Sequence, residues 1–473
     1  MVYERQKTQK ENPFFNLVKD QEICIIPEFE LESGEILRNI PLAYKTWGKL
    51  NETKNNALVV CHALTGSADV CDWWGPLLGP GKAFDPAKFF IVCINSLGSP
   101  YGSASPCTFN PETGDYFGPE FPLVTVKDDA RIQKMLLDDL GINQVAAVVG
   151  GSMGGMLVLE YAYFGPQFVR TIIPLATCAA HSAWAISWGE AQRQSIYSDP
   201  KYKDGYYKFD DPPVVGLGAA RMSAMLTYRS RNSFEAKFGR GKPDVDTTSG
   251  PWSPSEQRWA IHNHGHQHGK RLSESSSSSN TPIDGGSPAS SVPNSPSASA
   301  TDLKELGTTR VRRPQTYFTA QSYLRYQGQK FVKRFDANCY IAISRKMDTH
   351  DVSRGRADTV EDALELIEQP TLVIGISSDG LFTFTEQERL AQHIPNATLC
   401  KINSPEGHDA FLLEFVEINR LMTQFLKDKL SDLVGDSWQA TEVSLEDEKG
   451  HSSMFGESDD INEATAAVDV TSW

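Results

Sequence analysis

The sequence predicts an α/β fold in which helices cover a mostly parallel sheet. Five apolar runs show no alternation of polar and apolar residues, which is typical of strands buried on both faces of a sheet. These runs are residues 57–61, 89–94, 145–149, 171–175 and 371–376. Between them, apolar residues recur at three-to-four spacing over 126–140 and 153–164, which indicates amphipathic helices. Strands that alternate with such helices define the α/β class.

The rest of the chain departs from this alternation in three places. Residues 181–364 lack buried strands and are rich in Tyr, Trp and Arg, which favours a helical cap inserted over the sheet. Within the cap, 241–312 contains five consecutive serines and few large aliphatic residues. The conformational entropy lost on ordering this segment would therefore exceed the free energy gained by burying its apolar surface. We therefore predict two core segments at 1–180 and 365–431, a cap at 181–364 with a disordered insert at 241–312, and a disordered acidic tail at 432–473.

The charge of the chain is concentrated in that tail. The 473 residues carry 45 Lys+Arg and 60 Asp+Glu, a formal net charge of −15. The tail holds eleven acidic residues and one lysine, while the insert holds seven residues of each sign, so the globular body is only mildly acidic. A net negative chain is not suited to nucleic acid, because neutralising phosphates needs a basic surface. The mild acidity of the body still permits an anionic small-molecule substrate.

Other classes are excluded by what the sequence lacks. No run approaches the roughly 18 apolar residues of a membrane-spanning helix, and the polar N-terminus resembles neither a signal nor a transit peptide. We therefore expect a cytoplasmic protein without a membrane partner. Eight scattered cysteines without a CxxC pair predict reduced core thiols, and the alternating histidines of 262–268 have no Cys or acidic partners. We expect no metal.

The strand at 145–149 leads directly into a nucleophile motif. Gly150-Gly151-Ser152-Met153-Gly154-Gly155 is a G-x-S-x-G sequence between a predicted strand and a predicted helix. In that setting the turn is sharp, flanking glycines avoid clashes, and the serine hydroxyl stands above the sheet at the positive end of a helix. The alternative is a structural Gly-rich turn. We predict that Ser152 is the nucleophile of an α/β-hydrolase fold.

A serine nucleophile needs a base and an acid that orients it, in the chain order Ser, Asp or Glu, His. Of ten histidines, the ones in the insert, the tail, the region before the motif and the predicted helices do not fit this order, and His181 follows the serine too closely to leave room for an intervening acid strand. His408 remains, in the loop after the strand-like run 397–402, and Asp379 follows the strand at 371–376. We predict the triad Ser152, Asp379 and His408; ordinary loop polarity is the alternative for the last two.

The negative oxygen of an acyl-transfer intermediate needs preplaced N–H donors. One should be the amide of Met153, the residue after the nucleophile. The other should come from the loop after the strand at 57–61, where we choose Leu64. His62, in the same loop, is interpreted as a residue that packs the loop.

Seven segments together resemble homoserine O-acetyltransferase, most of all its fungal members. They are His62-Ala-Leu-Thr-Gly-Ser67, Asp72-Trp-Trp-Gly75, Asn95-Ser-Leu-Gly-Ser-Pro-Tyr-Gly-Ser103, Gly150 to Gly155, Ala220-Arg-Met-Ser-Ala-Met-Leu-Thr-Tyr228, Arg334-Phe-Asp-Ala-Asn338 and Gly407-His-Asp-Ala-Phe411. The likeness covers nearly all of the globular part, and several long motifs in one order are far more specific than the serine motif alone. The insert and the tail lie outside every motif.

The resemblance implies a ping-pong reaction. Ser152 takes the acetyl group from acetyl-CoA, a co-substrate rather than a bound cofactor, and the hydroxyl of L-homoserine then attacks the acetyl-enzyme to give O-acetyl-L-homoserine for methionine synthesis. By the same resemblance Arg221 binds the carboxylate of homoserine and Asp409 its ammonium; relatives also imply a homodimer. An Arg fork suits a carboxylate. The alternatives are a salt bridge within the cap for Arg221, and an N-cap of a helix beginning near Ala410 for Asp409.

Three rival functions stay open at this point. A relative with another acceptor, such as serine or deacetylcephalosporin C, would share every motif. A serine esterase would keep the triad and turn over acetyl-CoA without an acceptor. A non-enzymatic scaffold would not need the three triad residues intact.

Overall fold

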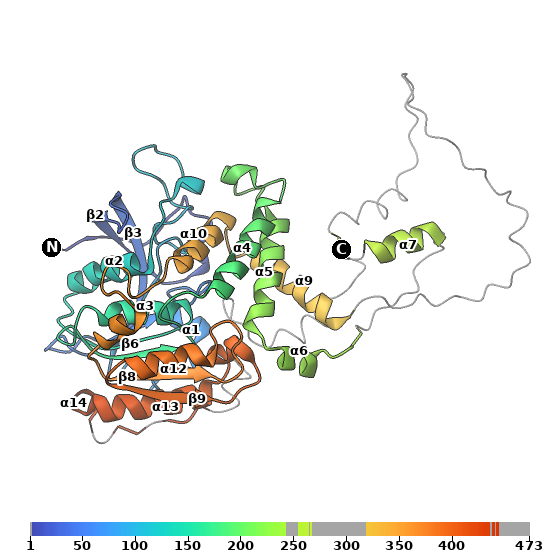
Figure 1. Ribbon diagram of the computed structural model, residues 1–473. Coiled ribbons are helices and arrows are strands. Elements are labelled where there is room, and N and C mark those ends of the chain that lie inside the picture. The colour runs from blue at the N-terminus through green and yellow to red at the C-terminus, as the bar shows by residue number, and fades with distance from the viewer. Residues whose placement is uncertain are drawn as a thin grey trace, which may run out of the picture. The chain divides into compact units, whose positions relative to one another are not determined.

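The computed structural model describes residues 2–242, 254–263, 265–266, 318–435, 438–439 and 441–443. Within them, one nine-stranded sheet has the order β1-β2-β3-β5-β4-β6-β7-β8-β9 (Figure 1). Its strands are β1 (Glu4–Gln6), β2 (Glu22–Glu30), β3 (Ile36–Trp47), β4 (Ala57–Cys61), β5 (Phe90–Ile94), β6 (Val145–Gly151), β7 (Val169–Leu175), β8 (Thr371–Ile376) and β9 (Ala397–Ile402).

The sheet is mostly parallel, as expected. The six strands from β5 to β9 in the sheet order pair in parallel, and β1, β2 and β3 add antiparallel pairs at one edge. The five predicted strands are all present, with ends within two residues of the predicted ones. The antiparallel strands were not predicted, because β2 and β3 mix buried and exposed positions irregularly and give no continuous apolar run. The predicted α/β fold class is confirmed.

Helices cover the sheet and form the region inserted after β7. Residues of β4 show that both faces are covered, since Val59 and Leu58 belong to different hydrophobic clusters on opposite sides. The helices are α1 (Val70–Trp73), α2 (Val126–Asp139), α3 (Met153–Ala162), α4 (Ala183–Tyr197), α5 (Val214–Tyr228), α6 (Arg231–Lys237), α7 (Pro254–His262), α9 (Thr319–Phe331), α10 (Ala337–Asp348), α11 (Val360–Glu365), α12 (Phe384–His393), α13 (Phe415–Lys429) and α14 (Ser431–Val434). No helix among the described residues combines the length and apolar character that crossing a membrane requires.

The chain divides into two compact units. One comprises 1–239 and 324–462, and the other comprises 240–323 and 463–473. The first therefore holds the sheet together with α4, α5 and α10 from the predicted cap. Most of the predicted insert lies outside the described residues. Its described part contains the helix α7, which the prediction of disorder missed; Pro254 suits a first helical position, and Glu, Gln, Arg and Ala in the following residues are good helix formers.

The predicted boundary of the acidic tail at 432 is too early. Asp432 lies in α14 and accepts two hydrogen bonds of 2.8 Å from Arg170. Further along, Trp438 is buried and its indole N–H donates to Asp85 at 3.0 Å. The reason is hydrophobic: Trp438 and Val443 supply apolar surface that the core covers, which the count of acidic residues concealed. Residues 444–473 lie outside the described part.

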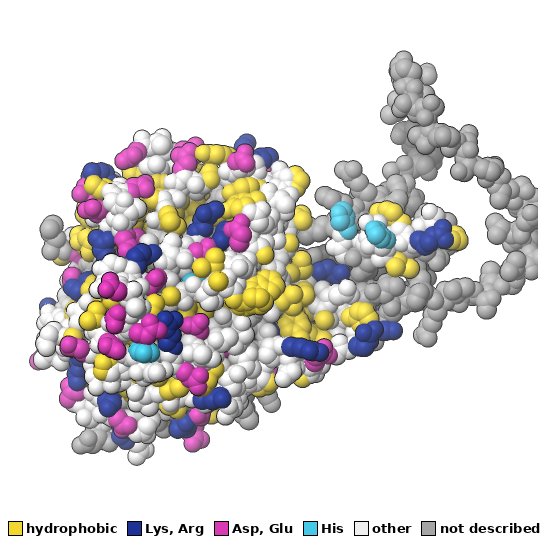
Figure 2. All heavy atoms as spheres, viewed as in Figure 1, with side chains coloured by type: hydrophobic (Ala, Val, Ile, Leu, Met, Phe, Trp, Pro, Cys, Tyr) yellow, Lys and Arg dark blue, Asp and Glu magenta, His cyan; other side chains and the backbone are white. Residues whose placement is uncertain are grey.

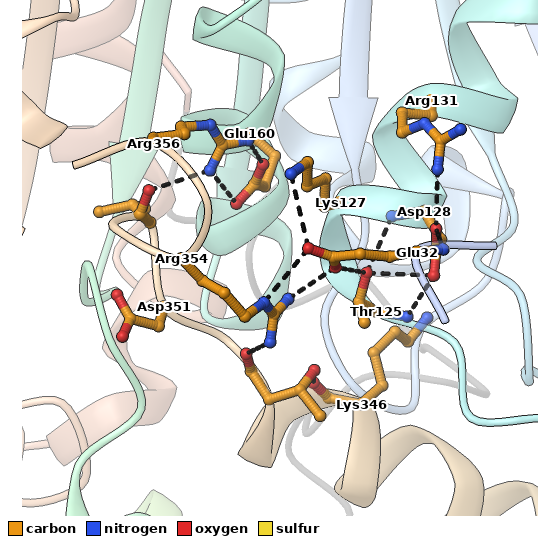
Figure 3. Close-up of polar contacts among 12 residues, drawn as sticks. Glu32, Thr125, Lys127, Asp128, Arg131, Glu160, Lys346, Asp351, Arg354 and Arg356 are labelled. Atoms are coloured by element: carbon orange, nitrogen blue, oxygen red, sulfur yellow. Dashed lines mark hydrogen bonds and ion pairs between the residues drawn. The ribbon is translucent and has the colours of Figure 1, made fainter. Parts of the chain in front are cut away.

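An ionic network joins the N-terminal strands to the helices behind the sheet (Figure 3). Glu32, just after β2, accepts hydrogen bonds from Arg354 at 2.8 Å and from the hydroxyl of Thr125 at 2.9 Å. Thr125 also caps α2, and Glu160 of α3 pairs with Arg356. The loop after α10 is thus tied to both α2 and α3. Figure 2 shows basic and acidic side chains interspersed over the visible face of this unit, which agrees with the mild net charge expected for the globular body.

Candidate active site

Ser152 lies at the sharp turn between β6 and α3. Its backbone has φ 59° and ψ −126°, a conformation that costs a non-glycine residue about 1–3 kcal/mol. Two hydrogen bonds hold it there. The Ser152 amide donates to the carbonyl of Leu175 at 3.1 Å, and the Thr177 hydroxyl donates to the Ser152 carbonyl at 2.8 Å. The last residue of the neighbouring strand β7, together with Thr177 two positions later, therefore fixes the turn that exposes the serine hydroxyl.

The glycines of the motif are required by close approaches. A Cβ on Gly154 would lie 2.2 Å from the carbonyl oxygen of Cys61, and a Cβ on Gly151 would lie 2.4 Å from a ring carbon of Phe411. The first contact is with backbone and has no room to relax. Any side chain at Gly154 would therefore push α3 away from β4 and displace Ser152, which directly precedes that helix.

His408 and Asp379 meet as the chain order predicts. His408 lies in a short 3₁₀ helix, Gly407–Leu412, and its Nδ1 is 2.7 Å from Oδ2 of Asp379, which follows β8. The other oxygen of Asp379 accepts hydrogen bonds from the amides of Leu381 and Phe382 at 2.8 and 2.9 Å. Because both side chains are buried and the carboxylate is fixed by backbone donors, the imidazole is held in one orientation.

The charge of Asp379 raises the pKa of His408. Burial lowers the pKa of His408, but the nearby carboxylate of Asp379 and its hydrogen bond raise it, and the net result is a pKa above the usual value of 6.5. Asp409 adds to the rise. A raised pKa makes the imidazole a stronger base toward a serine hydroxyl while leaving it neutral above that pKa.

Ser152 and His408 line one pocket, with a cavity volume of about 90 Å³. The sheet side contributes the loop after β4, and the cap contributes residues of α4, α5 and α10. The lining residues are Ala63, Leu64, Thr65, Gly66, Trp73, Ser152, His181, Ala185, Trp188, Gly189, Gln192, Arg221, Thr227, Tyr228, Ser344, Met347, Asp348, Leu381, His408, Asp409, Phe411 and Leu412. The pocket is mainly apolar with a few charged groups, as small-molecule sites usually are.

Of the two predicted oxyanion donors, one lines this pocket and the other directly follows Ser152, which lines it. Leu64 lines it from the loop after β4. Met153 is the first residue of α3, so its N–H has no acceptor within the helix. Neither amide donates to a backbone carbonyl in the turns, loops and caps of the described residues. Their role as oxyanion donors stays a prediction.

The two predicted substrate residues also line the pocket. Arg221, on α5, is buried, and its guanidinium lies over the rings of Phe331 and Tyr228, 5.0 and 5.5 Å from their centres. Asp409 is buried beside His408, and its Oδ2 is 3.1 Å from Nε of Arg229. The alternative role of Asp409 as an N-cap is wrong, because Glu406 is the residue that precedes the 3₁₀ helix and Asp409 lies inside it.

Arg229 was missed by the sequence analysis. It directly follows the quoted motif that ends at Tyr228, and it is buried between two carboxylates, those of Asp409 and Glu406. Two cap residues in the pocket, Gln192 and Asp348, were also missed. Their helices carry no local motif, so only their arrangement in space could identify them. Arg229 had one available signal, its position next to a motif that contains Arg221.

A second polar cluster lies away from the pocket. Cys107 Sγ is 3.5 Å from Cys339 Sγ, and Asp336 completes a buried group whose ligand atoms lie within 4.8 Å of one another. Both oxygens of Asp336 already accept hydrogen bonds, from the amide of Cys339 and the hydroxyl of Tyr207. Burial raises the pKa of the Cys339 thiol to about 11. The cluster is therefore better suited to packing, and all eight cysteines are free thiols.

Known proteins resemble the whole chain. A family model described as alpha/beta hydrolase fold matches residues 56–415. Homoserine O-acetyltransferase of Emericella nidulans is 57% identical, covering 99% of this chain and 98% of its own. The enzymes of the same name from Ascobolus immersus and Saccharomyces cerevisiae are 56% and 52% identical, covering 97% and 96% of this chain and 96% of each relative.

Solved structures support the fold. Homoserine O-acetyltransferase from Bacillus anthracis superposes with a TM-score of 0.66 at 20% identity, covering 90% of this chain and 98% of its own. Esterase E22 superposes with a TM-score of 0.64 at 22% identity, covering 86% of this chain and 99% of its own. At such identities the likeness concerns the fold. Together with the serine turn, the His408–Asp379 pair and the full-length relatives, it shows that the chain belongs to the α/β-hydrolase family and, within it, to the homoserine O-acetyltransferases.

Proposed function

We propose that this protein transfers an acetyl group from acetyl-CoA to the hydroxyl of L-homoserine through an acetyl-Ser152 intermediate. The observation that carries the proposal is the lining of one pocket: a strained serine, a histidine that is paired with a buried aspartate, and charged groups of both signs. The first two suit acyl transfer, and the charged groups suit a zwitterionic acceptor. The full-length similarity to enzymes named homoserine O-acetyltransferase supports the same conclusion.

In the first half-reaction the Ser152 hydroxyl attacks the thioester carbonyl. His408 takes the hydroxyl proton as the new C–O bond forms, and Asp379 stabilises the imidazolium that results. The negative oxygen of the tetrahedral intermediate accepts hydrogen bonds from the amides of Leu64 and Met153. As the C–S bond breaks, His408 returns its proton to the leaving thiolate of CoA. The product is an acetyl ester of Ser152.

In the second half-reaction the homoserine hydroxyl attacks that ester, and His408 accepts its proton. As the bond from the acetyl carbon to Ser152 breaks, His408 returns the proton to the Ser152 oxygen, and O-acetyl-L-homoserine is released. Arg221 holds the carboxylate of the amino acid, because its planar fork matches two carboxylate oxygens. The ammonium goes to Asp409. Arg229 lies between the carboxylates of Glu406 and Asp409, and so it orients Asp409 in the pocket.

Homoserine must outcompete water for the acetyl-enzyme. The pocket favours this because Ser152 and His408 are both at most 5% exposed, and the walls include the apolar side chains of Trp73, Trp188 and Phe411. An amino acid fixed by both of its charges places its hydroxyl beside the ester, whereas a water molecule has no such anchor.

The test is acceptor dependence. The protein is mixed with acetyl-CoA and offered homoserine, serine, deacetylcephalosporin C or no acceptor, while free thiol is followed and the products are identified. We expect fast steady-state thiol release only with homoserine. Equal release without an acceptor would favour a hydrolase, and faster release with either other acceptor would reassign the substrate. If acetyl-CoA released no thiol with any of the acceptors or without one, acyl transfer itself would be contradicted.

The homodimer implied by the resemblance stays a prediction. Hydrophobic side chains gather in the region of α4 and α5 (Figure 2), where Trp184 and Leu226 are 59% and 51% exposed. Exposed aromatic and aliphatic side chains of this size are typical of protein interfaces. We expect sedimentation equilibrium to give twice the chain mass of 52.3 kDa, and Trp184→Glu to lower that mass at the same concentration. A monomer at micromolar concentration would contradict the prediction.

A further inference from the structure

The loop after β4 contains a histidine that helps to fix the direction of one peptide group. His62 Nδ1 is 2.8 Å from the carbonyl oxygen of Ala63, which also accepts from the amide of Gly66 at 3.0 Å. That carbonyl and the N–H of Leu64 belong to the same peptide unit. Because a trans peptide is planar and its C=O and N–H point in opposite directions, fixing the Ala63 oxygen also fixes the direction of the Leu64 N–H.

The surroundings of His62 decide which ring nitrogen carries the proton. The amide of Ser96 donates to Nε2 at 3.0 Å, so Nε2 is an acceptor and the proton resides on Nδ1. The Nδ1–H therefore donates to the Ala63 carbonyl. The ring is 1% exposed, and burial lowers the pKa of His62 to about 4, which keeps the imidazole neutral at physiological pH. One stable tautomer thus links Ser96 to the Ala63–Leu64 peptide.

The residue after Ser96 is held by a buried ion pair. The next residue, Leu97, donates its amide to Asp129 at 2.8 Å and accepts at its carbonyl from Lys346 at 2.8 Å. Lys346 and Asp129 also pair with each other, and both are buried. Lys346 comes from α10 of the cap and Asp129 from α2 of the core, so the backbone beside Ser96 is fixed from two elements. Figure 3 shows Lys346 rising from its helix toward α2.

A second donor holds the same loop from the cap. Arg334, just before α10, is buried, and its Nη1 donates to the carbonyl of Thr65 at 3.2 Å. The carbonyls on either side of Leu64, those of Ala63 and Thr65, are therefore both occupied by side-chain donors. The Leu64 N–H lies between them, on a residue that lines the pocket.

We propose that His62 is a positioning residue for acyl transfer: its Nδ1–H holds the Ala63 carbonyl and so aims the Leu64 N–H at the oxyanion of the tetrahedral intermediate. This inference rests on the proposed function in one respect, the role of the Leu64 amide as an oxyanion donor. His62 does not itself contact the reacting atoms. A histidine that only fills space in the loop would not need its two ring nitrogens in these particular roles.

Two substitutions of His62 separate the effects of the two hydrogen bonds that its imidazole ring makes. In His62→Asn the side-chain amide occupies the place of Nδ1 and can still donate to Ala63, whereas in His62→Gln the amide lies near the place of Nε2 and serves Ser96 instead. The matched control is His350→Gln, a buried histidine bonded to the Cys178 carbonyl at 3.1 Å and absent from the pocket lining. The probe is p-nitrophenyl acetate in a stopped-flow instrument, because its burst amplitude counts active sites and its rate constant reports acetylation of each site.

Removing an oxyanion donor typically slows acylation by about 10²–10³-fold, and misdirecting one should give a smaller effect. We expect the burst rate constant per active site to fall at least about tenfold in His62→Gln and to stay within about threefold in His62→Asn and His350→Gln. The KM for acetyl-CoA should change less than about twofold in all three, since the ground state makes little use of this donor. Lower burst amplitude with an unchanged rate constant would indicate a merely structural role and would overturn the proposal.

The proposal is also overturned if His62→Asn is as slow as His62→Gln, or if His350→Gln is slowed equally. Its failure is distinguishable from failure of the proposed function. A wild-type burst without homoserine-dependent release of CoA would remove the proposed acceptor and leave the role of His62 intact. Homoserine-dependent turnover with equal rate constants in the Asn and Gln variants would remove only the role of His62. A wild-type protein without any burst would overturn both.

Discussion

Ser152→Ala is expected to lower kcat for homoserine-dependent thiol release by about 10⁴–10⁶-fold, because no acetyl-enzyme can form. The fold should be retained. The hydrogen bond from the amide of residue 152 to the Leu175 carbonyl joins backbone groups and survives the substitution. The hydrogen bond from the Thr177 hydroxyl to the carbonyl of residue 152 also survives, because it does not involve the serine side chain. Residual rate should come from binding and the oxyanion donors alone.

The measurement for Ser152→Ala is the thiol assay together with mass spectrometry of enzyme quenched after mixing with acetyl-CoA. The wild-type protein should gain one acetyl group on the peptide that contains Ser152, and the variant should gain none. Ser187→Ala is a suitable control, since this exposed hydroxyl bonds only to its own helix at Ala183. Activity of Ser152→Ala within tenfold of wild type would show that another residue is the nucleophile.

Asp379→Asn is expected to lower kcat/KM by about 10³–10⁴-fold. The asparagine oxygen would keep accepting from the amides of Leu381 and Phe382, so its NH₂ group would face Nδ1 of His408. That contact favours the tautomer with the proton on Nε2, which cannot accept the proton of Ser152. The substitution also removes the negative charge that stabilises the imidazolium.

The same substitution should move the pH profile. In the wild type the pKa of His408 is raised, so the neutral base, and with it kcat/KM, should be lost as the pH falls through a value above 6.5. Without the Asp379 charge, burial dominates and the pKa falls, so the acid limb should move to lower pH. The control is Asp211→Asn, which removes a carboxylate paired with Lys201 at the surface of the cap. It should leave the acid limb of the kcat/KM profile at the wild-type pH. An unshifted limb in Asp379→Asn would contradict the assignment.

The strands and the serine turn were predictable because their signals are local. β4, β6 and β8 are continuous apolar runs, and the glycines around Ser152 reflect steric contacts that recur wherever this turn is built. The antiparallel strands β2 and β3 lacked such a signal, since they lie at one edge with partly exposed positions. The start of the tail was misjudged for the opposite reason: its charge was conspicuous, whereas the burial of Trp438 depends on a distant part of the core.

The sequence by itself determined the order of Ser152, Asp379 and His408, because each follows a recognisable strand and the fold brings the ends of parallel strands to one edge. Only the tertiary structure decided how the charges of the pocket are distributed. Arg229 lies 180 positions before Asp409, and His62 lies 34 positions before Ser96, yet each pair is in contact. Contacts of this kind arise from packing between segments that are far apart in the chain, and no spacing within either segment encodes them. They place Arg229 beside Asp409 and bind His62 to the backbone of Ser96.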